Sequence, residues 1–308
     1  MPSKLRVKNS YIPWSFLDII ADKEGIFARQ DLEVEFFSVG RGQSEPSDKV
    51  SWYSELMTKR KLDAYSVCAW GAIDRLAADR KQKILAVSKS SSYAFSILVE
   101  PGLGVKTAKD LADVPIAVNM RTGSHYCVLS DLERALPYDK IKVIHAGEPQ
   151  ARLKGLLDRK FQAVALISPY TELAVRLGYM KVAETRTVDV LAFISRDDIE
   201  GHTMRRYLDS LNEAARELTA NPEKYRGLYL DTLRETFANF PNNMKNKLNQ
   251  VIEDVRPTLA ITTWSELEQY PKDSFESLST WMDKHKLLES LVSYEEIIYN
   301  EPLSSVQK

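Results

Sequence analysis

A turn at residues 119–126, Asn-Met-Arg-Thr-Gly-Ser-His-Tyr, combines side chains that can bind a small anion. It lies between a short apolar strand pattern and a helical pattern, so Thr122, Gly123 and Ser124 fall at the start of a helix. Unpaired N–H groups carry a partial positive charge there, which suits a phosphate, sulfonate or carboxylate group. The expected contacts are Asn119, Thr122, Gly123, Ser124 and His125. The alternative is that Thr122 or Ser124 only caps the helix.

A second turn, at residues 67–71, has the sequence Val-Cys-Ala-Trp-Gly and also follows an apolar strand pattern. Its small residues would let a ligand approach the backbone, and Trp70 offers a flat face on which a ring can stack. We include both Cys68 and Trp70 in the candidate site. For Cys68 the alternative is a small, buried structural side chain.

Three further side chains are candidates for the same site. Trp14 precedes the first helical pattern, and Tyr170 follows the end of a strand pattern at Ser168, so we expect the two rings to face each other across a cleft. A core position is the alternative for Trp14. Arg41 lies between two glycines, and its guanidinium can hold an anionic group through two hydrogen bonds. Arg121 competes for that role.

Cys68 and His125 also raise the question of catalysis, because a thiol beside an imidazole can act as a nucleophile with its base. We expect binding rather than catalysis, since two such residues often come close to a cleft by chance. The four histidines, at 125, 145, 202 and 285, do not have metal-ligand spacing. Gly102 and Gly104 lack the third glycine of a dinucleotide-binding turn. We therefore expect neither a metal nor a cofactor.

The composition limits the partners. The 308 residues include 42 basic and 43 acidic side chains, for a net charge of −1, which gives no reason to expect nucleic acid. No run of about 18 apolar residues occurs, so we expect no membrane insertion. With two distant cysteines and no secretory signal, we expect a cytoplasmic protein, although a chain without its leader would look the same. The expected partner is a small molecule, and the sequence leaves open whether a protein partner exists.

The sequence around these turns predicts alternating strands and helices, the pattern of βαβ units. Apolar runs predict strands at 5–7, 32–39, 64–67, 84–88, 95–99, 116–118, 141–144, 163–167 and 190–194. Amphipathic stretches predict helices at 14–23, 52–60, 72–78, 124–136, 149–158 and 170–177. From His202 onward the pattern is almost wholly helical.

This order predicts an α/β protein of two lobes, each a mixed sheet flanked by helices, with a helical C-terminal tail. Lobe one would comprise residues 1–98 and 193–308, because the strand at 190–194 leads back to the first set. Lobe two would comprise residues 99–192. The two crossovers, near 99–101 and 192–195, would form a hinge.

The chain resembles the type II periplasmic solute-binding proteins for nitrate, sulfonates and thiamine-pyrimidine precursors. Residues 21–27 (Ala-Asp-Lys-Glu-Gly-Ile-Phe) and 32–35 (Leu-Glu-Val-Glu) are similar to the first helix and second strand of that family. Residues 105–111 with 116–118 resemble the entry to its second lobe. Residues 153–157 with 161–165, and the ending from Trp281 to Glu296, are also similar. The resemblance spans nearly the whole chain through short phrases.

The resemblance implies a fold that closes around one ligand, with contacts at the turn that matches Thr122–Ser124. The aromatic residues together with the anion-binding turn favour a flat heteroaromatic or aromatic molecule with an acidic group, such as a relative of a thiamine-pyrimidine precursor. The resemblance also leaves an enzymatic alternative open, of the decarboxylase, desulfinase or pyrimidine-synthase type. The cysteine-rich motif of the synthases is absent here, whereas desulfinases of a related fold use a cysteine near a histidine, which would correspond to Cys68 and His125.

Overall fold

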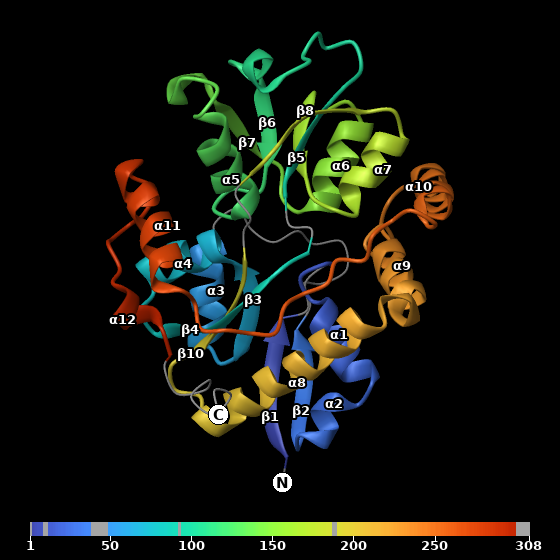
Figure 1. Cartoon of the computed structure of the whole chain (residues 1–308). Coiled ribbons are helices and arrows are strands. Elements are labelled where there is room, and N and C mark those ends of the chain that lie inside the picture. Colours follow the sequence, from blue (N-terminus) through green and yellow to red (C-terminus); the bar gives the residue numbers. More distant parts are fainter. Residues whose placement is uncertain (1, 9–11, 38–48, 92–93, 187–189, 300–308) are drawn as a thin grey trace.

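The chain is an α/β protein of two lobes, and each lobe is a mixed five-stranded sheet flanked by helices (Figure 1). The computed structural model describes residues 2–8, 12–37, 49–91, 94–186 and 190–299. The predicted fold class, including the helical C-terminal part, is confirmed.

The first sheet has the strand order β2-β1-β3-β10-β4, with β10 antiparallel to both of its neighbours. Its strands are β1 (Ser3–Lys8), β2 (Leu32–Phe37), β3 (Ala64–Cys68), β4 (Gln82–Lys89) and β10 (Val190–Arg196). Leu5 and Val7 alternate with charged residues in β1 and point into the core, as the period of a strand requires. The helices of this lobe are α1 (Phe16–Lys23), α2 (Ile26–Arg29), α3 (Lys49–Thr58), α4 (Ala69–Ala78) and α8 (Gly201–Ala220).

The second sheet has the order β7-β6-β8-β5-β9. Its strands are β5 (Ser96–Val99), β6 (Pro115–Val118), β7 (Lys142–His145), β8 (Ala163–Leu166) and β9 (Met180–Glu184). Its helices are α5 (Gly123–Leu132), α6 (Pro149–Leu157) and α7 (Tyr170–Arg176), with 3₁₀ turns η1 (Ala108–Leu111) and η2 (Tyr138–Lys140). The α5 side of the sheet has its own apolar core, built around Ile116, Val118 and Val128.

Both connections between the sheets lie nearer to the N-terminus than the predicted crossovers at 99–101 and 192–195. Residues 96–99 pair with β8 and β9 and so belong to the second sheet, although we expected this strand in lobe one. The connections lie between Lys89 and Ser96 and between Glu184 and Val190. Strand β9 was not predicted, because its sequence is short and mostly exposed. That the connections act as a hinge, and the exact bounds of the lobes, stay predictions.

The C-terminal region contacts both lobes, whereas we expected it to cover only the first. It contains α8, η3 (Pro222–Tyr225), α9 (Arg226–Glu235), α10 (Asn242–Val255), α11 (Lys272–Lys284) and α12 (Tyr294–Ile297). Helix α8 packs on α1 and α2, but α10 packs on α7 of lobe two, where Arg176 and Asp254 form an ion pair at 2.9 Å (Figure 1). The chain then returns to β4, since Glu268 pairs with Val87.

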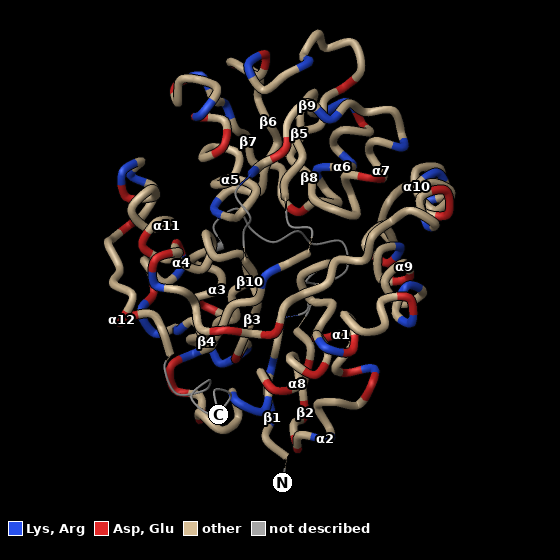
Figure 2. Tube along the Cα trace, viewed as in Figure 1, with Lys and Arg blue, Asp and Glu red and all other residues tan. Residues whose placement is uncertain are grey.

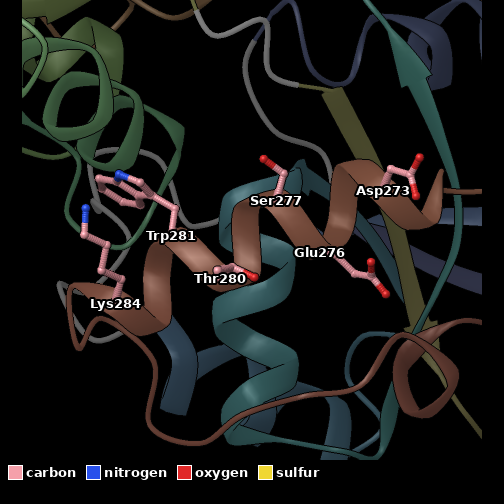
Figure 3. Close-up of a pocket in the computed structure, with 6 residues that line it drawn as sticks. All are labelled: Asp273, Glu276, Ser277, Thr280, Trp281 and Lys284. Atoms are coloured by element: carbon pink, nitrogen blue, oxygen red, sulfur yellow. The ribbon is translucent and has the colours of Figure 1, made fainter.

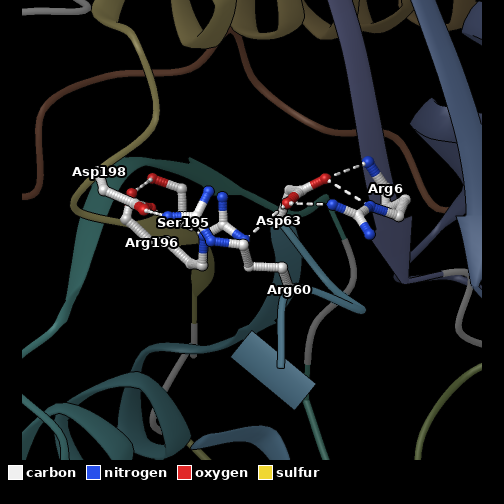
Figure 4. A network of polar contacts seen from close by, with 6 residues as sticks. All are labelled: Arg6, Arg60, Asp63, Ser195, Arg196 and Asp198. Carbon is white, nitrogen blue, oxygen red and sulfur yellow. Dashed lines mark hydrogen bonds and ion pairs between the residues drawn. The ribbon is translucent and has the colours of Figure 1, made fainter. Parts of the chain in front are cut away.

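A polar network holds β10 in the first sheet (Figure 4). The buried carboxylate of Asp63 accepts hydrogen bonds from the backbone N–H and Nε of Arg6, at 2.8 and 3.0 Å. Arg196, at the end of β10, forms an ion pair with the same carboxylate at 3.1 Å and a second one with Asp198 at 2.8 Å. Arg60 also pairs with Asp198. The buried carboxylate of Asp63 thus links β1 to β10, which are the first and last strands of this sheet in chain order.

Charged residues of both signs are interspersed over the outside of the two lobes (Figure 2). Among the described residues, no helix is both long and apolar enough to cross a lipid bilayer.

Asp18 generates a prediction about stability. This residue of α1 is completely buried and accepts a hydrogen bond from Tyr207 Oη of α8 at 2.7 Å. Burial raises the pKa of Asp18 from 3.8 to about 7. Between these values the folded state holds a proton that the unfolded state has released, so the free energy of unfolding should fall as the pH rises, by on the order of 4 kcal/mol.

We expect Asp18→Asn to remove this fall, because the amide cannot ionise. Denaturant unfolding of both proteins from pH 4 to pH 8 measures the effect. The variant should have the flatter profile and should be the more stable protein above pH 7. Parallel profiles would contradict the assignment.

Candidate functional site

The first turns of α4 and α5 meet at the sulfur of Cys68. Cys68 ends β3 and precedes α4, and its Sγ accepts a hydrogen bond from Gly71 N at 3.4 Å. The same sulfur accepts a hydrogen bond from Gly123 N, in the first turn of α5, at 2.8 Å. The predicted turns 67–71 and 119–126 come from different lobes, and the structure brings them together at this atom.

Buried hydrogen bonds shape the turn before α5. Thr122 Oγ1 donates to the carbonyl oxygen of Asn119 at 2.7 Å, and Ser124 Oγ accepts from Asn119 N at 2.9 Å. Arg152 Nη1 donates to Ser124 Oγ at 2.5 Å, and Asn119 Nδ2 donates to Glu148 Oε1 at 3.3 Å. The turn therefore contacts one basic and one acidic side chain, Arg152 and Glu148.

Arg152 and Glu148 were not among the predicted site residues. Both are buried, at 1% and 8% exposure, although arginine and glutamate are rarely buried unless they are paired. A usable signal was the strand pattern at 141–144 followed by the helix at 149–158, because this order places the start of the helix at the same sheet edge as Asn119. Asn119 Oδ1 is buried and has no hydrogen-bond partner among the described residues.

His125 is a neutral side chain in this site. Its Nδ1 accepts a hydrogen bond from the backbone N–H of Arg121 at 3.4 Å, and its ring packs on Tyr126. Burial, followed by the nearby charge of Arg121, lowers the pKa of His125 to about 4. At neutral pH the ring is therefore a weak base.

Asp74 joins the lobes beside this site. Its fully buried carboxylate, on α4, accepts hydrogen bonds from Arg121 Nε and Nη2 at 2.8 and 2.7 Å and from Tyr126 Oη at 2.9 Å. Burial and Asp74 together raise the pKa of Tyr126 well above its usual value. Arg121 Nη2 also donates to Glu289 at 3.1 Å, so two carboxylates share this guanidinium. Arg121 thus holds the two lobes against each other.

An aromatic cluster continues this contact. Trp70 stacks on Tyr126 of lobe two, with ring centres 5.8 Å apart, and meets the edge of Trp281 of α11 at 5.2 Å. Trp281 Nε1 donates to Glu133 Oε1 at 2.6 Å, and His285 Nε2 lies 3.0 Å from the other oxygen of that carboxylate. Helices α4 and α11 therefore both contact α5.

A pocket of about 350 Å³ begins beside Trp70. It is lined by Ala69, Trp70, Val190, Tyr270, Asp273, Ser274, Ser277 and Leu278. Trp70 Nε1 is buried and has no hydrogen-bond acceptor among the described residues. A neighbouring pocket of about 630 Å³ runs along α11 and shares Asp273 and Ser277 with the first (Figure 3).

Trp14 and Tyr170, also predicted for the site, lie near the starts of α1 and α7. Trp14 is buried in the turn before α1. Tyr170 is fully buried at the start of α7 and meets the ring of Phe237 edge-on, with ring centres 6.1 Å apart. Burial raises the pKa of Tyr170. Arg41 lies outside the described residues.

In the part of the chain that the structure describes, no three His, Cys, Asp or Glu side chains are grouped so that they could hold a metal ion.

Neither a protein-family model nor a curated protein matches this chain. Solved structures do. The alkanesulfonate-binding protein SsuA from Xanthomonas axonopodis pv. citri, bound to MOPS, is 15% identical over 97% of this chain and 98% of that one, with a TM-score of 0.74. The periplasmic aliphatic sulphonate binding protein SsuA from Escherichia coli is 16% identical over 98% and 93%, with a TM-score of 0.71.

A third similar structure is the desulfurization enzyme DSZB, 13% identical over 98% of this chain and 97% of that one, with a TM-score of 0.59. At these identities the comparisons show the fold alone, which is the two-lobed fold of periplasmic binding proteins.

The contact between the lobes generates a second prediction. Asp74→Ala should destabilise the protein by about 3–5 kcal/mol, because it leaves a partly buried guanidinium and a buried hydroxyl without their acceptor. The double variant, Asp74→Ala with Arg121→Met, should be destabilised by much less than the sum of the two single variants. Urea unfolding of the four proteins gives the coupling energy, expected at about 1–3 kcal/mol.

The exposed pair of Arg176 and Asp254 is the matched control, with an expected coupling below about 1 kcal/mol. Additive effects of Asp74→Ala and Arg121→Met would show that the ion pair between the lobes is not important for stability.

Proposed function

We propose that the protein binds a small anionic molecule between its lobes, where the first turns of α4 and α5 meet. The observation that carries this proposal is the convergence of Gly71 N and Gly123 N, from different lobes, on one sulfur atom. Two helix starts that face the same point create a positive potential there. An anionic oxygen of a ligand can accept the hydrogen bond from Gly123 N in place of the sulfur of Cys68.

The polar cluster under α5 supports an acidic ligand. Arg152 supplies a buried positive charge, and its hydrogen bond to Ser124 holds the guanidinium against the first turn of α5. Arg41 remains a proposed second cation. Two similar solved structures are named as an alkanesulfonate-binding protein and an aliphatic sulphonate binding protein, which is consistent with an acidic group on the ligand.

The pocket beside Trp70 supports a flat ring as the rest of the ligand. Its volume of about 350 Å³ lies within the usual range for small-molecule sites, roughly 300–1,000 Å³. Trp70 and Tyr270 provide aromatic walls, and the indole N–H can donate to a ring nitrogen. Asp273 and Ser277 can accept hydrogen bonds from an amino group. A heteroaromatic molecule with an acidic group, related to a thiamine-pyrimidine precursor, meets these requirements.

Catalysis by Cys68 is the second candidate. Two N–H donors on one sulfur stabilise a thiolate, and a thiolate is the nucleophilic form of cysteine. His125, with a pKa lowered to about 4, is poorly suited to take the thiol proton. A nucleophilic Cys68 would therefore rely on the two helix starts, and binding stays the first proposal.

Native mass spectrometry of the purified protein tests both candidates. We expect a retained molecule of one mass in wild type and in Cys68→Ser, because the hydroxyl replaces a small buried thiol at a cost of about 1–3 kcal/mol. Arg152→Gln and Ser124→Ala should weaken retention by about ten-fold or more, since they remove a charge-assisted hydrogen bond. Arg176→Gln, on the surface of α7, should change nothing.

The outcomes separate the two candidates. Retention that is unaffected by Arg152→Gln and Ser124→Ala would refute the proposed site. A new product mass that forms with wild type and is absent with Cys68→Ser would establish catalysis. In that case His125→Ala tests whether the ring takes part. If the protein only binds, this change should merely raise the dissociation constant.

A further inference from the structure

A separate pocket lies on lobe two, beside the C-terminal half of α5. Its volume is about 360 Å³. On this side of the second sheet, α5 and η1 cover the core, while β5 and the edge strand β9 border the pocket. The first turn of α5 forms the site between the lobes, so the two sites use opposite ends of one helix.

The floor of this pocket is apolar. It is formed by Ile97 of β5, Val128 and Leu132 of α5, and Val182 of β9. Three of these side chains are buried members of the core under α5, and Val182 packs against that core. The pocket is therefore an accessible extension of the core, and it suits the hydrocarbon part of a ligand.

Two acidic side chains, Asp131 and Glu184, line the pocket, and each has a basic partner. Glu184 is paired with Lys181 at 2.5 Å and accepts a hydrogen bond from Ser96. Asp131 lies 3.8 Å from Arg134. Arg186, which also lines the pocket, is exposed and has no ion pair with any residue that the structure describes. Lys181 neutralises Glu184 and Arg134 neutralises Asp131, so the guanidinium of Arg186 is the charge left over at the pocket.

We propose that this pocket binds an amphipathic organic anion, with its apolar chain or ring on the floor and its carboxylate or sulfonate group on Arg186. A planar guanidinium holds such groups through two parallel hydrogen bonds. This proposal does not depend on the proposed function, because none of its residues contacts the site at Cys68.

Isothermal titration calorimetry of the full chain with octanoate, and with octanamide as its uncharged counterpart, tests the proposal. Wild type should bind octanoate at least about ten-fold more tightly than octanamide, since one charge-assisted contact distinguishes the two probes. Arg186→Gln should abolish that difference, and Arg186→Glu should weaken octanoate further. Ala135→Trp, which fills the pocket, should abolish binding of both probes.

Arg159→Gln is the matched control, because Arg159 is an exposed arginine of lobe two that pairs with Glu100 away from the pocket. It should leave both affinities unchanged. Equal affinity for the two probes, no binding of octanoate, or full binding by Arg186→Glu would overturn the proposal. Loss of octanoate in Arg152→Gln but not in Arg186→Gln would place the probe between the lobes, which overturns this site and leaves the proposed function standing.

Discussion

The arrangement of the two lobes depends on the buried carboxylate of Asp74. A carboxylate without solvent is stable only if other groups satisfy it, and here Arg121 and Tyr126 of the opposite lobe do so. Because this contact requires defined geometry, it sets the position of α5 relative to α4. In this arrangement Gly123 N, two residues after Arg121, lies 2.8 Å from the sulfur of Cys68. The candidate site thus lies beside an ion pair whose carboxylate is fully buried.

The C-terminal region adds to this constraint on both sides of lobe two. Helix α10 packs on α7, and α11 contacts α5 through Trp281 and Glu133. The two chain connections between the sheets are therefore not the only links between the lobes. Any movement of α5 away from α4 would separate the rings of Trp70 and Tyr126.

The same hydrogen bonds bear on binding and on catalysis. Helix starts that stabilise an anion do so whether the anion belongs to a ligand or is the thiolate of Cys68. The environment of His125 separates the two cases, since burial and the charge of Arg121 keep its ring neutral. The geometry around Cys68 therefore favours an anion, while the neighbouring imidazole lacks the proton affinity expected of a general base.

The sequence by itself determined the alternation of strands and helices, the two-lobed α/β class and the two turns around Cys68 and Gly123, because periodic apolar residues and helix starts are local features. Only the tertiary structure decided that Ser96–Val99 joins the second sheet and that α10 packs on lobe two. It also revealed Asp74 and Arg152 as buried partners of the turn before α5. In the sequence these are ordinary helical charges, since the partner of a buried charge depends on which distant segments pack together.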